Sequence, residues 1–387
     1  MLNFNYNIPT KIFFGKNKID VLAKEIKNYG NKVLLVYGGG SIKRNGLYNK
    51  ITNILNENNI NFWELGGVDP NPRLSSVKSG IKLCRENKIE LILAVGGGST
   101  IDCAKVIGAG YYYDGDAWDI VMDSRKIKKV LPIASVLTLA ATGSEMDSGA
   151  VITNMETNEK IATINDGMAP KFSILDPTYT FSVPKNQTAA GVADIMSHIF
   201  EVYFSNTKEA YLQNRMGEAL LKTCINYGKK AIDCPENYEA RSNLMWTASL
   251  AINGLLSYGK ETEWSVHAME HELSAFYDIT HGVGLAILTP YWMEYALNGS
   301  TVDKFVEYGV NVWGLDANDE KYEIAHNAIR KTREYFNLLG MPSSLKEVEI
   351  DDEKLEKMAK QATIRGKLGN FKVLEAEDVL NIYKSAL

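Results

Sequence analysis

Two strand-like runs in the first third of the chain each end in three consecutive glycines. The run Lys32–Tyr37 is followed by Gly38–Gly40, and the run Leu91–Val95 is followed by Gly96–Gly98. Glycines let a backbone turn sharply and approach a ligand closely, and a helix that starts after such a turn directs free N–H groups at an anion. Two of these turns suit the two ends of a dinucleotide, although either turn alone is also compatible with a tight turn that binds nothing.

Strand-like and helical patterns alternate up to about Asp176. A helical pattern over Tyr48–Asn56 separates the first run from a strand-like run at Asn61–Leu65, and a further strand-like run covers Val130–Val136. Strands that are joined by helical crossovers pair in parallel, with helices covering both faces of the sheet. The alternating segment 150–163 predicts an additional hairpin. The N-terminal half is therefore predicted to be an α/β domain with a Rossmann-like parallel sheet.

The character of the chain changes at Pro184. Beyond this residue, apolar side chains recur at helical spacing, as at Ile195 and Ile199, and strand-like runs are few. We therefore expect an α/β dinucleotide-binding domain over residues 1–184 and an all-α domain over residues 185–387, in which the candidate metal ligands lie.

Composition excludes several other classes of protein. The chain has 387 residues and a formal net charge of −5, which offers no basic field for nucleic acid. It contains no run of about 18 consecutive apolar residues, as a membrane helix requires, and its start lacks the pattern of a signal peptide. The four cysteines form no Cys-x-x-Cys pair and indicate free thiols in a reducing compartment. These features predict a cytoplasmic enzyme without a nucleic-acid or membrane partner.

Histidine is scarce, with five in the whole chain, and the spacing of four of them indicates a metal site. Asp194 and His198 are four residues apart on a predicted helix, His267 and His271 repeat that spacing, and His281 follows soon after. Side chains four residues apart share one face of a helix and can reach a single ion. Each histidine alone is also compatible with an ordinary core or surface role, but one Asp with three His forms a ligand set for Fe²⁺ or Zn²⁺ that leaves a position open.

The first glycine turn also bears on the choice of dinucleotide. A carboxylate at this place selects NAD by binding the ribose 2′-hydroxyl, and none follows Tyr37 closely in this chain. Ser41 is followed instead by Lys43 and Arg44, which are able to receive a 2′-phosphate. These residues favour NADP(H), and NAD(H) is the alternative if both cations point into solvent.

Four segments together resemble the group III, iron-containing alcohol dehydrogenases, in particular the butanol dehydrogenase-like branch that includes NADPH-dependent aldehyde reductases. The segments are Gly96–Asp102, Thr138–Glu145, Asp194–His198 and His267–Gly282. The similarity runs from Asn7 to Lys384 and therefore covers essentially the whole chain. It implies a dehydroquinate synthase-like fold, one Fe²⁺ or Zn²⁺ per chain, and a homodimer.

The resemblance also implies roles for particular residues. By this likeness the metal ligands are Asp194, His198, His267 and His281. His271 matches a position beside the nicotinamide that is not a ligand, and we expect this side chain to relay a proton to solvent. The implied cofactor contacts are Gly38, Gly39, Ser41, Asn71, Gly97, Gly98, Ser99, Asp102, Thr138, Thr142 and Lys160.

The combined features predict a metal-dependent, NAD(P)-linked alcohol dehydrogenase or aldehyde reductase that acts on short-chain primary alcohols and aldehydes. Trp264, Leu285 and Tyr291 lie near the motif segments and predict an apolar pocket. A glycerol or 1,3-propanediol dehydrogenase of the same superfamily is the nearest alternative. A metal-dependent phosphohydrolase accounts for the Asp and His cluster but needs no glycine turns, and a non-catalytic nucleotide-binding protein would bind cofactor without turnover.

Overall fold

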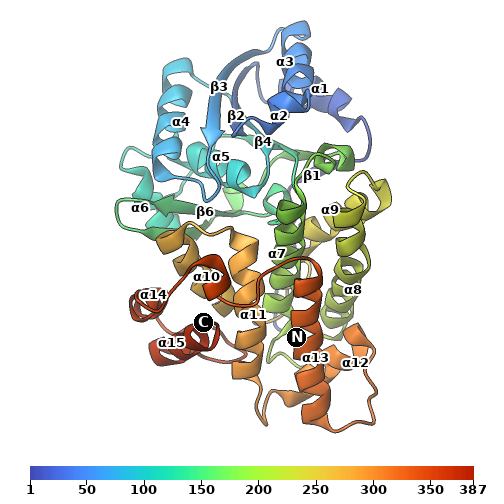
Figure 1. Ribbon diagram of the computed structural model, residues 1–387. Coiled ribbons are helices and arrows are strands. Elements are labelled where there is room, and N and C mark those ends of the chain that lie inside the picture. The colour runs from blue at the N-terminus through green and yellow to red at the C-terminus, as the bar shows by residue number, and fades with distance from the viewer. The chain divides into compact units, whose positions relative to one another are not determined.

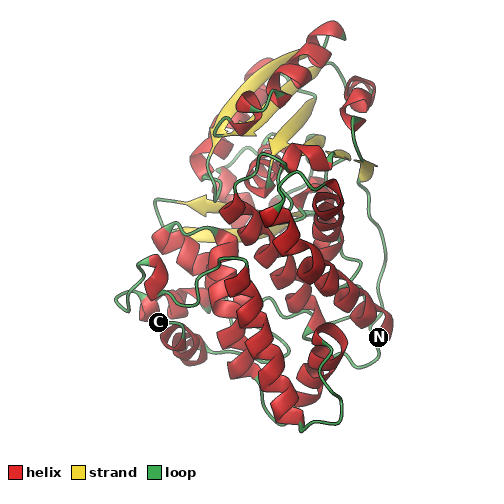
Figure 2. Ribbon diagram, turned by 45° about the vertical axis from the view of Figure 1, so that its right-hand side comes forward, coloured by secondary structure: helices red, strands yellow, loops and turns green.

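The computed structural model describes residues 1–387, and the chain divides into two compact units. The sheet unit comprises Asn7–Val183 and Pro235–Ser249. The helical unit comprises Met1–Tyr6, Pro184–Cys234 and Leu250–Leu387. Figure 2, in which strands are yellow and helices red, shows that the strands are confined to part of the chain.

Six parallel strands in the order β1-β8-β5-β4-β2-β3 form the centre of the sheet unit. They are β1 Lys11–Phe14, β2 Lys32–Gly38, β3 Asn61–Val68, β4 Leu91–Gly96, β5 Ile133–Leu137 and β8 Phe172–Leu175. The predicted parallel sheet is confirmed, although the sequence patterns did not indicate the short strands β1 and β8. The predicted hairpin is a separate antiparallel pair, β6 Gly149–Asn154 and β7 Glu159–Ile164.

Alternate residues of the central strands point into two separate cores. The helices of this unit are α1 Leu22–Lys27, α2 Ser41–Arg44, α3 Leu47–Glu57, α4 Leu74–Asn87, α5 Gly98–Gly110 and α6 Ala117–Met122. Leu34 and Val36 of β2 pack with side chains of α4, α5 and α6, whereas Val33 and Leu35 pack with those of α1 and α3. Figure 1 shows α4 and α3 on opposite sides of β2 and β3. Because both faces of the sheet are covered, the strand is a continuous apolar run rather than an alternating one.

The helical unit consists almost wholly of helices, as the 3.6-residue periodicity after Pro184 predicts. They are α7 Lys185–Tyr203, α8 Tyr211–Asp233, α10 Ser265–Tyr277, α11 His281–Ala296, α12 Val302–Trp313, α13 Lys321–Leu338, α14 Leu355–Ala362 and α15 Ala376–Ser385. The central pair is α7 and α11, and α10 packs against α11. Most residues of α7 and α11 are buried, which explains why both helices are apolar on nearly all sides.

The N-terminal segment 1–6 belongs to the helical unit and not to the domain over 1–184 that the sequence led us to expect. The backbone N–H of Leu2 donates to the carbonyl of Gly259 at 2.9 Å. The ring of Tyr6 contacts that of Tyr258, with centroids 5.3 Å apart. These contacts join residues that are far apart in the sequence, so local patterns did not reveal them.

The segment 235–249, which includes most of α9 (Tyr238–Ile252), belongs to the sheet unit rather than to the expected domain over 185–387. The Trp246 ring packs on Phe14, with centroids 5.9 Å apart. Ser249 donates a hydrogen bond to the buried Glu145 carboxyl. Since α9 is helical like its sequence neighbours, only these long-range contacts assign it to the sheet unit.

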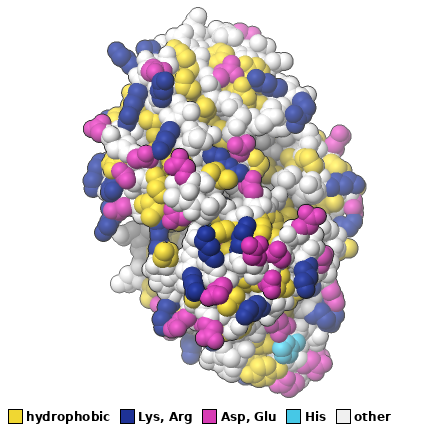
Figure 3. Space-filling model, turned by 60° about the vertical axis from the view of Figure 1, so that its left-hand side comes forward, with side chains coloured by type: hydrophobic (Ala, Val, Ile, Leu, Met, Phe, Trp, Pro, Cys, Tyr) yellow, Lys and Arg dark blue, Asp and Glu magenta, His cyan; other side chains and the backbone are white.

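Figure 3 shows basic and acidic side chains interspersed over the face in view. No helix in the structure combines the length and the apolar character that crossing a bilayer requires.

We expect Ser249→Ala to lower the free energy of unfolding by about 1–3 kcal/mol, because the buried Glu145 carboxyl then loses this donor. Ser242→Ala on the same helix is the matched control, since the exposed Ser242 hydroxyl bonds only to the carbonyl of Glu239. Its expected effect is below about 0.5 kcal/mol. Urea unfolding followed by circular dichroism measures both variants, and equal midpoints would contradict the role assigned to Ser249.

Candidate functional site

A buried carboxylate gathers three imidazoles inside the helical unit. Asp194 and His198 lie one turn apart on α7, His267 lies on α10, and His281 is the first residue of α11. The Asp194 Oδ1 atom lies 3.7 Å from Nε2 of His198, 4.0 Å from Nε2 of His267 and 3.7 Å from Nε2 of His281. The structure thus brings together the four residues that are expected to be metal ligands.

The chemistry of these four side chains fits a divalent cation. Ligand atoms of Asp194, His267 and His281 all lie within 4.8 Å of one another. Two ligands of a tetrahedral ion, each about 2.0–2.2 Å from it, are roughly 3.4 Å apart, so small side-chain movements bring this set into range. Burial, together with the neighbouring His267, lowers the pKa of His198 well below its usual value. A neutral imidazole presents the lone pair that a cation requires.

Glycines allow α11 to reach α7 closely enough to build this cluster. A Cβ atom at Gly282 would lie 2.0 Å from the carbonyl oxygen of Ala190 on α7, and one at Gly284 would lie 2.7 Å from Cγ of Glu270. The backbone of α11 therefore packs directly on α7 and on a side chain of α10. This close packing carries His281, which immediately precedes Gly282, to Asp194.

Glu201 is a buried carboxylate beside the cluster that the sequence analysis missed. Its Oε1 atom accepts the backbone N–H of His267 at 2.9 Å and lies 3.0 Å from Nδ1 of the same residue. Burial raises the pKa of Glu201, and hydrogen bonds from the backbone N–H groups of residues 264–267, which favour the charged carboxylate, oppose that rise. A helical signal was available, because Glu201 follows Asp194 by two turns of α7.

Glu270 is a second buried carboxylate that the sequence analysis missed. Its Oε2 atom contacts Nδ1 of His281, and its Oε1 atom accepts a hydrogen bond from Ser274. Glu270 follows His267 by three residues on α10 and therefore lies on the same side of that helix. Each of the two glutamates thus contacts the Nδ1 atom of a candidate ligand.

His271 lies beside the cluster rather than within it. Its ring centroid is 5.7 Å from that of His281, and its ring is partly exposed. Potential ligand atoms of His271, Glu270 and His281 lie within 4.8 Å of one another, in a second group that shares His281 with the one around Asp194.

Of the three side chains expected to line an apolar pocket, Trp264 contacts the cluster. Its ring centroid lies 5.1 Å from that of His267 and 6.1 Å from that of His198. Leu285 is fully buried within α11, and the Tyr291 hydroxyl donates to a backbone carbonyl at 3.1 Å. These contacts place Trp264, but neither of the other two, against the candidate ligands.

The glycine turns and the hydroxyl-rich segment lie at one edge of the sheet. Because β2, β4 and β5 are adjacent and parallel, Gly38–Ser41, Gly97–Ser99 and Thr138–Thr142 follow their carboxyl ends side by side. A Cβ atom at Gly98 would lie 2.3 Å from Oγ1 of Thr142, so the second turn and the hydroxyl-rich segment touch. The chain order reverses between β2 and β4, which is where open α/β sheets bind their ligands.

Asn71 and Lys160 are connected to this edge through the hairpin. Asn71 follows β3 and has a left-handed backbone, with φ 52°. Two residues later, Arg73 forms a β-bridge with Thr153 of β6, and Thr153 pairs with Lys160 of β7. The structure therefore places Lys160 alongside the segment that follows β3.

Asp102 holds the segment that follows β5 on α5. Its two carboxylate oxygens accept hydrogen bonds from the Ser144 hydroxyl at 2.5 Å and from the backbone N–H of Val151 at 2.8 Å. The buried Lys105, one turn later, donates to the same hydroxyl at 2.9 Å and to Asp147. Burial raises the pKa of Asp102 to about 6. With both oxygens engaged by the protein, Asp102 acts on this edge by shaping the segment 144–151.

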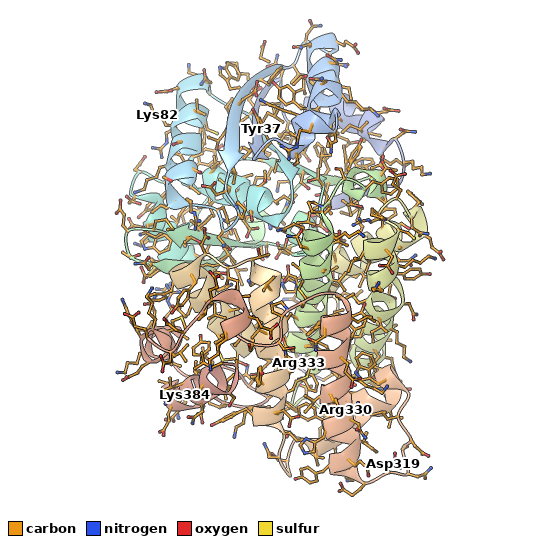
Figure 4. The ribbon with its side chains drawn as sticks, in the orientation of Figure 1. Tyr37, Lys82, Asp319, Arg330, Arg333 and Lys384 are labelled. Atoms are coloured by element: carbon orange, nitrogen blue, oxygen red, sulfur yellow. The ribbon has the colours of Figure 1, made fainter.

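Lys43 is exposed, but its cation contacts two aromatic rings. Its Nζ atom lies 4.9 Å from the ring centroid of Tyr37, which Figure 4 labels on β2, and 4.7 Å from that of Tyr48. Both tyrosine hydroxyls donate to the Glu64 carboxylate, at 2.7 and 2.8 Å. The contact with the Tyr37 hydroxyl raises the pKa of Lys43. Two aromatic rings and a nearby carboxylate therefore hold this cation.

Comparison with known proteins gives matches over both units. The family model "Iron-containing alcohol dehydrogenase" matches residues 9–177, and "Fe-containing alcohol dehydrogenase family, C-terminal" matches residues 188–387. The chain is 66% identical over 390 residues to NADH-dependent butanol dehydrogenase B of Clostridium acetobutylicum, with 100% of both chains covered. It is 37% identical over 394 residues to the NADPH-dependent aldehyde reductase YqhD of Escherichia coli, again with 100% of both chains covered. The crystal structure of NADH-dependent butanol dehydrogenase A from Thermotoga maritima superposes with a TM-score of 0.96 at 40% identity, covering 100% of this chain and 99% of that one.

Proposed function

Because the chain belongs to the iron-containing alcohol dehydrogenase family, we propose that it interconverts short-chain primary alcohols and aldehydes, with butanol and butanal as a substrate pair. As a member of this family it is a metal-dependent, NAD(P)-linked alcohol dehydrogenase. The observation that carries the substrate proposal is the 66% identity, over the full length, to a butanol dehydrogenase. Family membership removes the phosphohydrolase and the non-catalytic alternatives.

We propose Asp194, His198, His267 and His281 as ligands of one Fe²⁺ or Zn²⁺ per chain. When bound, such an ion supplies Lewis-acid stabilisation of negative charge on a substrate oxygen. One carboxylate and three neutral imidazoles leave the set of ligands with a single negative charge, so the ion keeps its positive character. The helical unit would then be the metal and substrate domain.

The sheet unit would be the dinucleotide-binding domain. We propose that the turns Gly38–Ser41 and Gly97–Ser99 bind the phosphates through backbone N–H groups, with Thr138, Thr142, Asn71 and Lys160 as further contacts.

Oxidation of an alcohol transfers a hydride to the nicotinamide and releases a proton. We assign the relay of that proton to the partly exposed His271. A homodimer and a cytoplasmic location stay predictions.

We propose NADH as the preferred cofactor, in place of the NADPH that the cations after Ser41 favour. Lys43 is held by two tyrosine rings, and the carboxylate of Glu64 accepts hydrogen bonds from both tyrosine hydroxyls. A cation engaged in this way is less available to a 2′-phosphate, and the nearby carboxylate would repel the phosphate. The NADH dependence in the name of the 66% identical relative supports the same choice.

The purified protein, loaded anaerobically with Fe²⁺ or Zn²⁺, should oxidise butanol with a kcat/KM roughly tenfold or more above that for glycerol or 1,3-propanediol. Trp264 is the reason, because an apolar ring beside the ligands disfavours a polyol. Chelation should remove the activity and the metal should restore it. An equal or higher kcat/KM for either polyol would show that the enzyme is a polyol dehydrogenase.

Asp194→Ala and His267→Ala should reduce turnover to the level of the metal-free enzyme and lower the melting temperature, because both side chains belong to a buried polar cluster, while the dinucleotide affinity stays near that of the parent. The proposed ligands lie in the helical unit, and the glycine turns lie in the sheet unit. His326→Ala is the matched control, because His326 is an exposed histidine of the same unit that pairs with Glu294. Steady-state kinetics and elemental analysis check this prediction. Parent-like turnover in either ligand variant would exclude the assignment.

The ratio of kcat/KM for NADH to that for NADPH should exceed one in the parent, and Lys43→Ala should change it by less than about threefold. Gly39→Asp should raise the ratio about tenfold or more, because a carboxylate at this turn binds the ribose 2′-hydroxyl and repels a 2′-phosphate. A Cβ atom at Gly39 meets nothing within 4 Å, so the turn accepts the side chain. A parent that prefers NADPH tenfold would overturn the argument from Lys43 and Glu64.

A further inference from the structure

Two of the three candidate imidazole ligands have a buried carboxylate on the ring nitrogen that faces away from Asp194. For His267 this carboxylate is Glu201, and for His281 it is Glu270. We propose that Glu201 and Glu270 are positioning residues, which fix the orientation of His267 and His281 and strengthen the binding of the metal. This inference rests on the proposed function and extends it to residues for which no role has been assigned.

The Glu201 carboxylate holds both the backbone and the ring of His267. Its Oε1 atom accepts the backbone N–H at 2.9 Å and lies 3.0 Å from Nδ1. The same residue's carbonyl accepts the N–H of Glu263 at 2.7 Å, so the end of α7 is tied to the chain that enters α10. The first N–H groups of a helix favour a negative charge. The side chain of Glu201, which extends from α7, lies against the first turn of α10. His267 therefore has little freedom to rotate away from Asp194.

The Glu270 carboxylate bridges α10 and α11. One oxygen contacts Nδ1 of His281, and the other accepts a hydrogen bond from Ser274 one turn along α10. Its side chain is fully buried, and α11 passes it through a glycine, because a Cβ at Gly284 would lie 2.7 Å from Glu270 Cγ. The packing of α10 on α11 thus accommodates a buried carboxylate at a position where an apolar side chain would carry no desolvation cost.

The consequence for the histidines is chemical as well as geometric. An imidazole that donates Nδ1–H to a carboxylate keeps its lone pair on Nε2, which is the atom of His267 and of His281 that faces Asp194. The negative charge behind the ring also makes the ring a stronger donor to a metal. His198 differs, because its Nδ1 atom has no hydrogen-bond partner, and its ring is held by stacking on His267 at a centroid distance of 4.7 Å.

A second cation between Glu270, His271 and His281 is the competing interpretation of the same side chains. Their potential ligand atoms lie within 4.8 Å of one another. The direct contact between the Glu270 carboxylate and Nδ1 of His281 leaves no gap for an ion between those two groups. We therefore expect one ion per chain, with Glu270 orienting the histidine.

The test measures metal affinity and not only activity. Zn²⁺ or Co²⁺ is titrated against a competing chelator into the metal-free full-length protein. The proteins compared are the parent, Glu201→Ala, Glu270→Ala, Glu201→Gln and Glu270→Gln. We expect the Ala variants to bind the ion about 10–100-fold more weakly and the Gln variants to fall between them and the parent, since an amide oxygen still accepts Nδ1–H but carries no charge. The visible spectrum of bound Co²⁺ should change in all four variants.

Glu263→Gln is the matched control. Glu263 is equally buried in the same unit. Its carboxylate accepts hydrogen bonds from the Ser265 hydroxyl at 2.6 Å and from the N–H of Phe371 at 2.6 Å, and neither donor is a histidine. It should keep the parent affinity and the parent Co²⁺ spectrum. If an Ala variant does not fold, as judged by the melting temperature of the metal-free protein, the corresponding Gln variant decides.

Parent-like affinity in the Gln and Ala variants would overturn the inference, as would an equal loss of affinity in Glu263→Gln. A second ion per chain that disappears in Glu270→Gln would replace positioning by ligation at that residue. A parent that binds no divalent ion would contradict the proposed function itself. Tight binding by the parent with unchanged variants would contradict only the roles of Glu201 and Glu270.

Discussion

The burial of Asp194 among three imidazoles is the interaction on which the arrangement of the helical unit depends. A charged carboxylate in a protein interior carries a desolvation cost of several kcal/mol, and a divalent cation shared with neutral imidazoles offsets that cost. Assembling the four side chains requires α11 to pack closely on both α7 and α10. Gly282, whose Cβ would overlap the carbonyl of Ala190, is the residue that makes this packing possible. The site therefore dictates how closely these helices pack.

The features that could be predicted from the sequence are those whose residues lie within a few positions of one another. Asp194 and His198 are one helical turn apart, and each glycine turn directly follows its strand, so both signals lie within short windows. The parallel sheet is predictable for the same reason, because a strand such as β2 is continuously apolar only when both of its faces are covered. The four proposed ligands could thus be named before the structure showed that they meet.

Features that depend on contacts between distant residues could not be predicted in this way. Glu201 contacts a histidine 66 residues later. The spacing on α7 places Glu201 on the same side as Asp194, but it does not indicate which residue of another helix Glu201 contacts. Lys43 is a sharper example, because its sequence neighbours predict a cation that is free to receive a phosphate. In the structure the rings of Tyr37 and Tyr48 hold it, and Glu64 on the next strand binds both tyrosines. The preference for a dinucleotide therefore cannot be derived from the turn alone.

The two functional regions differ in how they tolerate substitution. The metal cluster and its two glutamates are buried, so the loss of any member leaves another polar group without its partner in a water-poor interior, which is costly. Lys43 and Glu64 are exposed, and water replaces a lost partner there at little cost. The two sets of residues also belong to units with separate cores. Substitutions that change the choice of dinucleotide should therefore cost less stability than those that change the metal ligands.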